Sequence, residues 1–249
     1  VLALGADPIR LPLEGDGARD VLSVNDLQDY ARFAQALEGA QQVVILGAGL
    51  IGCEFANDLL ARGIRPTVID IAERPLGRLL PPEAGERMRD QLQDAGVSFR
   101  FGAAVTRVDR HGSAYRLHLD DGTGLDADLV LSAIGLRPRT ALAQAAGVLV
   151  GRGGVQVDRL LATSAPHVYA VGDNAQVAGH NLPYVLPLMQ QARALGATLA
   201  GIPTAVNYPA MPVIVTQESL VERLPEHRAR VVVVGDETAA GLEESATGL

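Results

Sequence analysis

The feature that most constrains the fold of this chain is a glycine-rich turn between an apolar run and a helix-forming segment. The apolar run is Val43–Leu46, and Gly47-Ala48-Gly49-Leu50-Ile51-Gly52 follows it at once. A helix-forming stretch, Cys53–Ala61, comes next, and a second buried strand, Thr67–Ile69, ends at Asp70. Strand, G-x-G-x-x-G turn, helix, strand and terminal acid is the order typical of a dinucleotide-binding unit.

The order of these elements explains why glycine is needed at each of the three positions in the turn. Gly47 permits the tight turn, Gly49 lets a pyrophosphate approach the backbone at the helix N-terminus, and Gly52 lets the helix pack on the strand. The carboxylate of Asp70 can accept hydrogen bonds from a ribose 2′-hydroxyl and repel a 2′-phosphate. A glycine-rich turn that binds nothing would leave this acid unexplained. The predicted NAD-binding residues are Gly47, Ala48, Gly49, Leu50, Ile51, Gly52 and Asp70.

Composition excludes several other classes of protein. The chain has 249 residues, 48% hydrophobic and 20% charged, which is typical of one large or two ordinary globular domains. A net charge of −8 argues against nucleic acid as a partner. Cys53 is the single cysteine, so no internal disulfide and no C-x-x-C pair is expected. No apolar run approaches the roughly 20 residues of a membrane helix, and the five histidines lack metal-ligand spacing.

The first residues, Val1-Leu2-Ala3-Leu4-Gly5-Ala6, have the pattern of a buried strand that ends in a turn. Because a natural N-terminus rarely begins inside a core strand, we expect further residues upstream. Periodicity and caps predict helices from Asn25 or Asp26 to Gly39 and over Glu83–Ala95, Thr140–Ala146 and Pro187–Ala200. They predict strands over Val97–Phe101, Ala103–Asp109, Ala114–Leu119, Leu129–Ile134, Val155–Asp158, Met211–Val215 and Val231–Val234, a helical turn at Glu218–Leu224 and a polar tail, Asp236–Leu249.

Three apolar strands end in a small residue and a glycine, at Ala3-Leu4-Gly5-Ala6, Ala133-Ile134-Gly135 and Val171-Gly172-Asp173. At the carboxyl edge of a parallel sheet, such ends let a cofactor come close to the backbone. With these stretches the sequence resembles the two-dinucleotide-binding flavoprotein reductases, and within them the rubredoxin–NAD reductases. The resemblance spans about Val1–Pro212 and is carried by VLALGADPIR, NDLQDYARFAQAL, VVILGAGLIGCEFANDLLARG, LVLSAIGLRPRT, TSAPHVYAVGDNAQV and LPYVLPLMQQARAL.

This resemblance implies an α/β fold of Rossmann-like, three-layer nucleotide-binding domains, in which an NAD domain is inserted into an incomplete FAD domain. The implied segments are 1–24 and 137–208 for the FAD domain, 25–136 for the NAD-binding domain, and 209–249 for a partial C-terminal segment with no fold assigned. The implied cofactors are FAD and NADH.

For the NAD domain, the resemblance implies that Glu54 lies near the nicotinamide, as a candidate catalytic residue, and that Gly135 lines the NAD cleft. Glu54 also fits a plain helix N-terminal acid favoured by the helix dipole, and the sequence leaves both interpretations open. Arg74 and Arg78 are candidates for binding a 2′-phosphate. Because Asp70 already disfavours that group, NADH rather than NADPH is expected.

For the FAD domain, the resemblance implies that Gly5 and Arg10 border the flavin cofactor. Gly172 gives access to the backbone, and Asp173 hydrogen-bonds the ribityl chain. Tyr184-Val185 precedes a helix whose N-terminal dipole faces the flavin pyrimidine, where it stabilises negative charge on the reduced flavin.

The sequence departs from the family pattern at two places, which limits how far the roles of family residues can be assigned to this chain. The first G-x-G-x-x-G of the family, which holds the FAD pyrophosphate, does not occur within the 249 residues. Arg230–Asp236 resembles a first nucleotide strand but lacks the second glycine, so a permuted FAD site there is disfavoured. Thr216–Leu249 does not match the interface domain that the family implies.

The sequence therefore predicts a cytoplasmic, FAD-dependent oxidoreductase that passes electrons from NADH to a small iron–sulfur carrier, with rubredoxin as the first candidate. The lack of a C-x-x-C pair argues against a disulfide reductase. Arg137 and Arg139 fit either docking residues for an acidic carrier or plain surface residues. Two alternatives stay open. One is a reductase for ferredoxin or another carrier, and the other is a nucleotide-binding fragment without turnover that retains FAD weakly.

Overall fold

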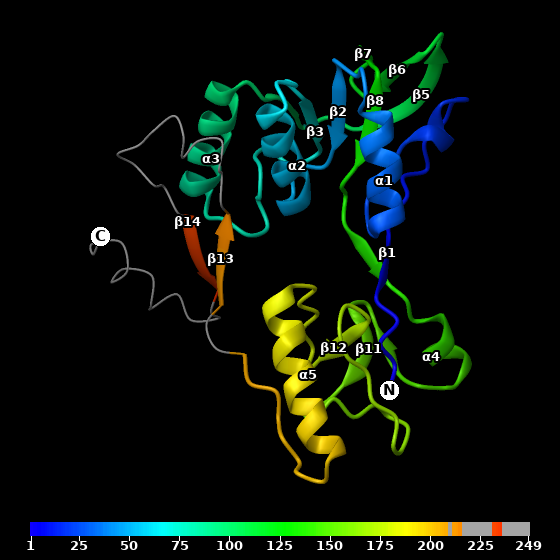
Figure 1. Cartoon of the computed structure of the whole chain (residues 1–249), viewed down its shortest axis with the longest axis vertical. Helices are drawn as coiled ribbons and strands as arrows, with labels where there is room; N and C mark the ends of the chain where they lie inside the picture. The colour runs from blue at the N-terminus through cyan, green and yellow to red at the C-terminus, as the bar shows by residue number, and fades with distance from the viewer. Residues whose placement is uncertain (209–210, 216–230, 236–249) are drawn as a thin grey trace. The chain divides into compact units, whose positions relative to one another are not determined.

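A computed structural model describes residues 1–208, 211–215 and 231–235 of the chain (Figure 1). The chain divides into two compact units. Val1–Asp7 and Leu136–Pro212 belong to unit 1, and Pro8–Gly135 belongs to unit 2. The segment boundaries expected at residues 24/25 and 136/137 stay predictions. Each unit is described by itself.

Unit 2 is built on a four-stranded parallel sheet. Its strands are β2 (Val43–Leu46), β3 (Thr67–Asp70), β4 (Ser98–Phe101) and β8 (Leu129–Ser132), in the order β4-β3-β2-β8. Ile45 pairs with Val68 on one side and with Leu131 on the other, so the carboxyl ends of these strands meet at one edge. The chain runs outward from β2 to β4 and then adds β8 on the other side of β2. Open parallel sheets bind ligands where the strand order reverses in this way.

Both faces of this sheet are covered, which gives unit 2 three layers. One face carries helices α1 (Leu27–Ala36), α2 (Leu50–Ala61) and α3 (Pro82–Ala95), and the other carries the antiparallel strands β5 (Val105–His111), β6 (Ala114–Leu119) and β7 (Gly124–Ala127) (Figure 1). Side chains along β2 alternate between the two cores. Val43 and Ile45 pack under the helices, whereas Val44 and Leu46 pack under the antiparallel strands.

Local signals in the sequence account for the ends of these helices. Asp26 caps α1, because its side chain accepts a hydrogen bond from the N–H of Asp29 at 2.7 Å, and this confirms the predicted cap. Helix α3 ends at Gly96, whose φ of +117° suits glycine. Helix α2 begins at Leu50, three residues before the predicted start, with Gly49 as its N-cap.

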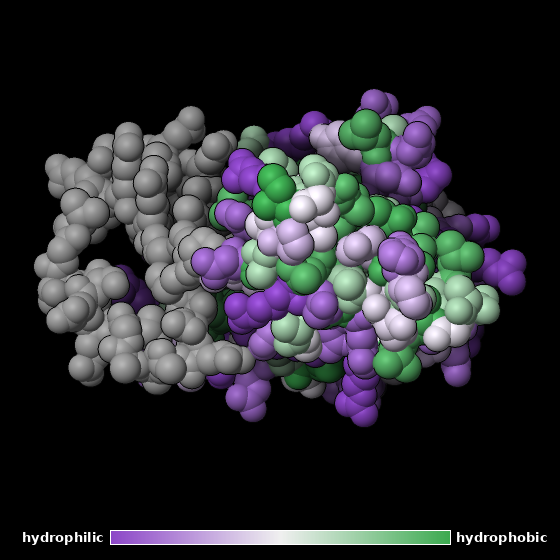
Figure 2. Space-filling view, turned by 90° about the horizontal axis from the view of Figure 1, so that it is seen from below, coloured by the Kyte–Doolittle hydropathy of each residue, from purple (hydrophilic) through white to green (hydrophobic). Residues whose placement is uncertain are grey.

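Unit 1 contains a smaller sheet and one long helix. Its elements are β10 (Val150–Gly151), β11 (Gly154–Val157), β12 (Ala175–Val177), α4 (Ala141–Ala145) and α5 (Val185–Leu199), with β10-β11-β12 as the strand order. Buried side chains of these elements, including Val155 and Leu195, form one core together with Leu161 from a connecting loop. Figure 2 shows a face of the molecule on which hydrophobic residues gather in patches among polar ones.

Five further elements complete the description. Strand β1 (Ala6–Pro8) pairs with β9 (Leu136–Pro138), and a short 3-10 helix, η1, spans Ala18–Asp20. Strands β13 (Met211–Val215) and β14 (Val231–Gly235) pair with each other, as the predicted strands at these positions allow. The helical turn predicted at Glu218–Leu224 and the tail Asp236–Leu249 lie outside the described residues.

Two strand predictions need correction, and a strand was missed. The opening residues do not form a continuous strand, because only Leu2 makes a bridge, to Ala170, before β1 begins at Ala6. The apolar run before Gly172 likewise forms only isolated bridges among the described residues, Tyr169 with Ala162 and Ala170 with Leu2. Strand β7 was missed because Gly124–Ala127 is short and shows no clear alternation.

Candidate functional site

The glycine turn of unit 2 lies where the strand order reverses, between the ends of β2 and β8. Gly47 has φ +106°, and a side-chain carbon there would lie 2.6 Å from the carbonyl oxygen of Ala133, just beyond β8. A side-chain carbon at Gly52 would overlap the carbonyl oxygen of Gly47. Both positions therefore need glycine for the turn, the helix and the strand to pack together, as predicted from the sequence.

Gly49 is different, because the fold itself does not require it. A side-chain carbon at Gly49 would meet no heavy atom of the described residues within 4 Å. Its backbone is extended, with φ −74° and ψ −174°, which any residue adopts. Gly49 is also the N-cap of α2 and has no side chain to cap it, so the first N–H groups of the helix lack side-chain acceptors there. Open space over uncapped amides is what a bound diphosphate requires.

Asp70 ties the end of β3 to this turn. Its carboxylate accepts hydrogen bonds from the N–H of Ala48 at 2.5 Å and from the N–H of Ala72 at 2.8 Å. A carboxylate offers about four acceptor positions, so two backbone bonds leave capacity for ribose hydroxyls. The side chain is half-buried and held at the sheet edge. Its bond to Ala48 was not predicted from the sequence.

A second support of the turn comes from the loop after β3. Leu76 has φ +54°, which is strained for a branched side chain, and its N–H donates to the carbonyl oxygen of Ala48 at 2.8 Å. Leu76 is buried. Nearby, the side chain of Arg74 lies over Gly85 of α3, and its buried Nε finds no hydrogen-bond partner among the described residues. Arg78 is exposed. No sequence signal indicated the contact of Leu76.

Helix α2 carries the two remaining candidates near the turn. Glu54 is an exposed residue whose carboxyl pKa is raised above its ordinary value, first by partial desolvation and then by the charge of Asp58. Cys53 is buried, and burial, followed by the charges of Asp70 and Glu54, raises the pKa of its thiol to about 12. A thiol of this kind stays protonated near neutral pH. Cys53 is thus the small buried helix residue that the sequence predicted.

The candidate flavin residues of unit 1 centre on the turn at Gly172. Gly172 has φ +85°, and Asp173 after it is half-buried. Within the described residues, the carboxylate of Asp173 makes no hydrogen bond, so it is available to a hydroxyl. Tyr184 is the N-cap of α5 without a side-chain cap, and Val185 is exposed. An available carboxylate and an uncapped helix start fit the ribityl chain and the pyrimidine of a flavin.

The structure distributes the other predicted residues between the units. Gly5, with φ +70°, belongs to unit 1 with the Gly172 turn, whereas Arg10 and Gly135 belong to unit 2 with the Gly47 turn. Arg10 is exposed and makes no hydrogen bond within the described residues. Arg139 pairs with Asp7 at 2.6 Å and donates to the carbonyl oxygen of Leu4, so its guanidinium has partners within unit 1.

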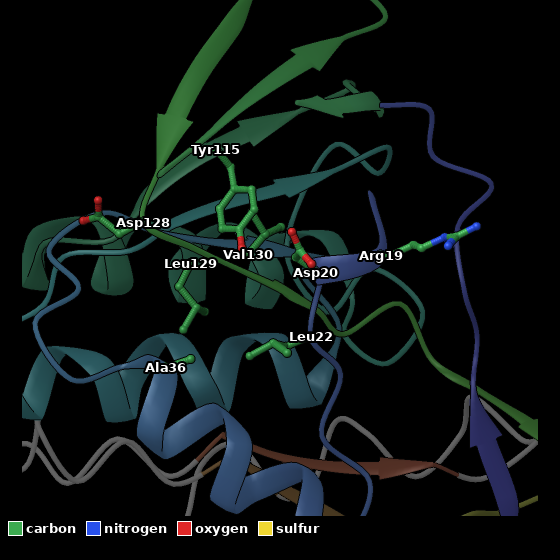
Figure 3. Close-up of a pocket in the computed structure, with 8 residues that line it drawn as sticks. All are labelled: Arg19, Asp20, Leu22, Ala36, Tyr115, Asp128, Leu129 and Val130. Carbon is green, nitrogen blue, oxygen red and sulfur yellow. The ribbon is translucent and has the colours of Figure 1, made fainter. Parts of the chain in front are cut away.

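A pocket of about 310 Å³ in unit 2 is separate from the glycine turn (Figure 3). It lies at the amino end of β8, beside Leu129 and Val130, whereas the turn lies at the carboxyl ends of the strands. The ring of Tyr115 and the carboxylate of Asp20 line it, and Asp20 is already paired with Arg110 at 2.6 Å. Nucleotides bind at the carboxyl edge of such sheets, so this pocket is not the nucleotide site.

Comparison with known proteins identifies the family. Residues 1–196 match the family described as pyridine nucleotide-disulphide oxidoreductase. The chain belongs to this family. The α/β fold with two nucleotide-binding domains, expected from the sequence, is confirmed by solved structures of the family's reductases.

Two curated relatives are rubredoxin-NAD(+) reductases, and one similar solved structure is a ferredoxin reductase. The chain is 53% identical over 217 residues to a rubredoxin-NAD(+) reductase of Alcanivorax borkumensis, covering 86% of this chain and 56% of the relative. It is 51% identical over 219 residues to the rubredoxin-NAD(+) reductase of Acinetobacter baylyi, with the same coverage. A ferredoxin reductase for the CYP199A2 system from Rhodopseudomonas palustris superposes with a TM-score of 0.79 at 31% identity, covering 85% of this chain and 54% of that structure.

The chain spans about half the length of the curated relatives it matches. Within the described part of this family member, no helix is both long and apolar enough to cross a membrane. In residues 1–208, 211–215 and 231–235, three or more potential metal ligands do not gather at any point.

Proposed function

We propose that this family member is an FAD-dependent reductase that takes electrons from NADH and passes them to a small iron–sulfur carrier, first of all rubredoxin. The observation that carries the proposal is the geometry of the Gly47 turn. A side-chain carbon at Gly49 would enter open space, the start of α2 has no side-chain cap, and the carboxylate of Asp70 is bonded to the neighbouring N–H of Ala48. Amides suit a diphosphate, and the carboxylate suits a ribose diol.

The residues of the chain bind and orient the cofactors, whereas bound FAD would supply hydride acceptance and the release of single electrons. In unit 2, Asp70 selects a 2′-hydroxyl over a 2′-phosphate by charge. In unit 1, Asp173 accepts from a ribityl hydroxyl, and the N-terminus of α5 stabilises negative charge at the pyrimidine. Glu54 lies on the exposed side of α2, where it orients the nicotinamide amide.

The choice of carrier rests on the rubredoxin-NAD(+) reductases, which are the relatives at 51–53% identity. A ferredoxin carrier is the second candidate, and the ferredoxin reductase at 31% identity favours it less. A cytoplasmic location fits NADH as the donor, and a single buried cysteine needs no oxidising compartment.

Anaerobic stopped-flow absorbance tests the proposal on the FAD-loaded protein. NADH should bleach the flavin band, and NADPH should do so far more slowly. Adding oxidised rubredoxin or ferredoxin in parallel should then restore the band, faster with rubredoxin. A flavin band that neither nucleotide bleaches contradicts the reductase, and a faster return with ferredoxin contradicts only the choice of carrier.

A further inference from the structure

The backbone of the Gly172 turn is held by three hydrogen bonds from different directions. The carbonyl oxygen of Gly172 accepts from the N–H of Ala175 at 2.9 Å. The carbonyl oxygen of Asp173 accepts from Nδ2 of Asn181 at 3.0 Å. The N–H of Gly172 donates to Oε1 of Gln191 at 2.7 Å. Both peptide groups around Asp173 are therefore fixed, while its carboxylate has no partner within the described residues.

Gln191 differs from the other two partners because it lies on α5. It is 1% exposed, and its Nε2 donates to the hydroxyl oxygen of Tyr208 at 2.9 Å, so the amide is bonded at both ends. Leu188, one turn earlier on the same helix face, also contacts the turn, since a side-chain carbon at Gly172 would lie 3.2 Å from its Cδ1. Gln191 thus links the turn directly to the helix.

Burying a side-chain amide lowers the free energy of unfolding unless all of its polar atoms are hydrogen-bonded. A well-packed apolar residue at this position would therefore stabilise the fold equally well. The position of Gln191 suggests a more specific task. The turn carries Asp173, and α5 presents its uncapped N-terminus. A single cofactor can meet both groups only if the turn and the helix keep a fixed orientation.

We propose that Gln191 is a positioning residue for the flavin. Its amide holds the N–H of Gly172 and so fixes the direction of the Asp173 carboxylate relative to α5. The inference rests on the proposed function, because it takes FAD to be the ligand of unit 1. It adds a residue that touches neither the flavin nor the nicotinamide but sets the affinity for FAD.

Two substitutions separate positioning from plain stability. Gln191→Met keeps the length and the apolar packing of the side chain but removes the acceptor for Gly172. Tyr208→Phe is the matched control, since it leaves Nε2 of Gln191 without its partner but keeps the bond to Gly172. Gln191→Met loses both buried hydrogen bonds of the amide and Tyr208→Phe loses one of them, so both should lower the thermal midpoint, Gln191→Met by more. Should Gln191→Met fail to fold, Gln191→Asn replaces it, because its amide is one methylene too short to reach Gly172.

The measurements are FAD titration by flavin fluorescence and hydrogen exchange of the Gly172 amide in the FAD-free chain. We expect Gln191→Met to bind FAD about tenfold more weakly and to exchange the Gly172 amide about tenfold faster, with Tyr208→Phe close to wild type in both. Equal FAD affinity in wild type and Gln191→Met, or an equal loss in Tyr208→Phe, overturns the inference and leaves the proposed function standing. If the wild-type chain itself shows no FAD binding, the flavin assignment of unit 1 fails, and the inference fails with it.

Discussion

The carboxylate of Asp70 accepts a hydrogen bond from the backbone N–H of Ala48 at 2.5 Å, which joins the end of β3 to the glycine turn after β2. The side chain that is expected to hold the ribose therefore also shapes the loop that is expected to hold the diphosphate. Both parts of the proposed NAD site are ordered by one residue.

Asp70 should make the protein prefer NADH over NADPH. A fixed carboxylate repels a 2′-phosphate, so we expect wild type to bind NADH at least about tenfold more tightly than NADPH, the size of a charged contact. Asp70→Asn should narrow this ratio, because a neutral amide no longer repels the phosphate. Fluorescence titration with each nucleotide measures the ratio. Glu73→Gln removes an exposed acid three residues later and serves as the control. If Asp70→Asn has the same preference for NADH over NADPH as wild type, another residue determines which nucleotide binds.

Gly49 and Gly52 should respond differently to the same substitution. Gly52→Ala places a carbon against the carbonyl oxygen of Gly47, and we expect a loss of about 1–3 kcal/mol in the free energy of unfolding. Gly49→Ala enters open space with an unstrained backbone, so its thermal midpoint should stay near that of wild type. Its NADH affinity should nevertheless fall, because the new carbon lies in the path of the diphosphate. Full NADH affinity in Gly49→Ala would show that the diphosphate lies elsewhere.

Cys53 should make stability depend on pH in the alkaline range. Its folded-state pKa of about 12 lies above the value of about 8.5 in an unfolded chain. The unfolded thiol therefore ionises first, so the stabilising contribution is complete below about pH 8.5 and is lost progressively as the pH rises towards 12. Urea unfolding at pH 7 and pH 10 should show a larger fall in the free energy of unfolding for wild type than for Cys53→Ala. Equal falls in the two proteins would contradict the burial of a neutral thiol.

Much of unit 2 could be predicted because its sequence signals are local. Val43–Leu46 is apolar at every position because both faces of β2 are buried. Positions 47 and 52 are glycines because a side-chain carbon at either would clash with nearby backbone, and the G-x-G-x-x-G motif marks both positions. The cap at Asp26 and the stop at Gly96 are likewise properties of a few neighbouring residues.

The parts that were missed depend on partners far along the chain. The strained backbone of Leu76 is explained only by its bond to Ala48, and the burial of Gln191 only by Gly172 and Tyr208. The opening strand was overestimated for the same reason, because an apolar run becomes a strand only where neighbours supply hydrogen bonds. Of residues 1–5, only Leu2 makes a bridge, through its hydrogen bonds with Tyr169 and Val171. The sequence around Leu76, Gln191 and Leu2 has no motif or periodicity from which these long-range contacts could be predicted.

Calorimetric titration of NADH into the wild-type protein and into Asp70→Ala tests the central claim most directly. If the Gly47 turn and Asp70 hold the nucleotide, wild type binds one NADH per chain, and Asp70→Ala binds it about tenfold more weakly or worse, with Glu86→Ala on α3 unchanged. No heat of binding in wild type, or equal affinity in Asp70→Ala, contradicts the account.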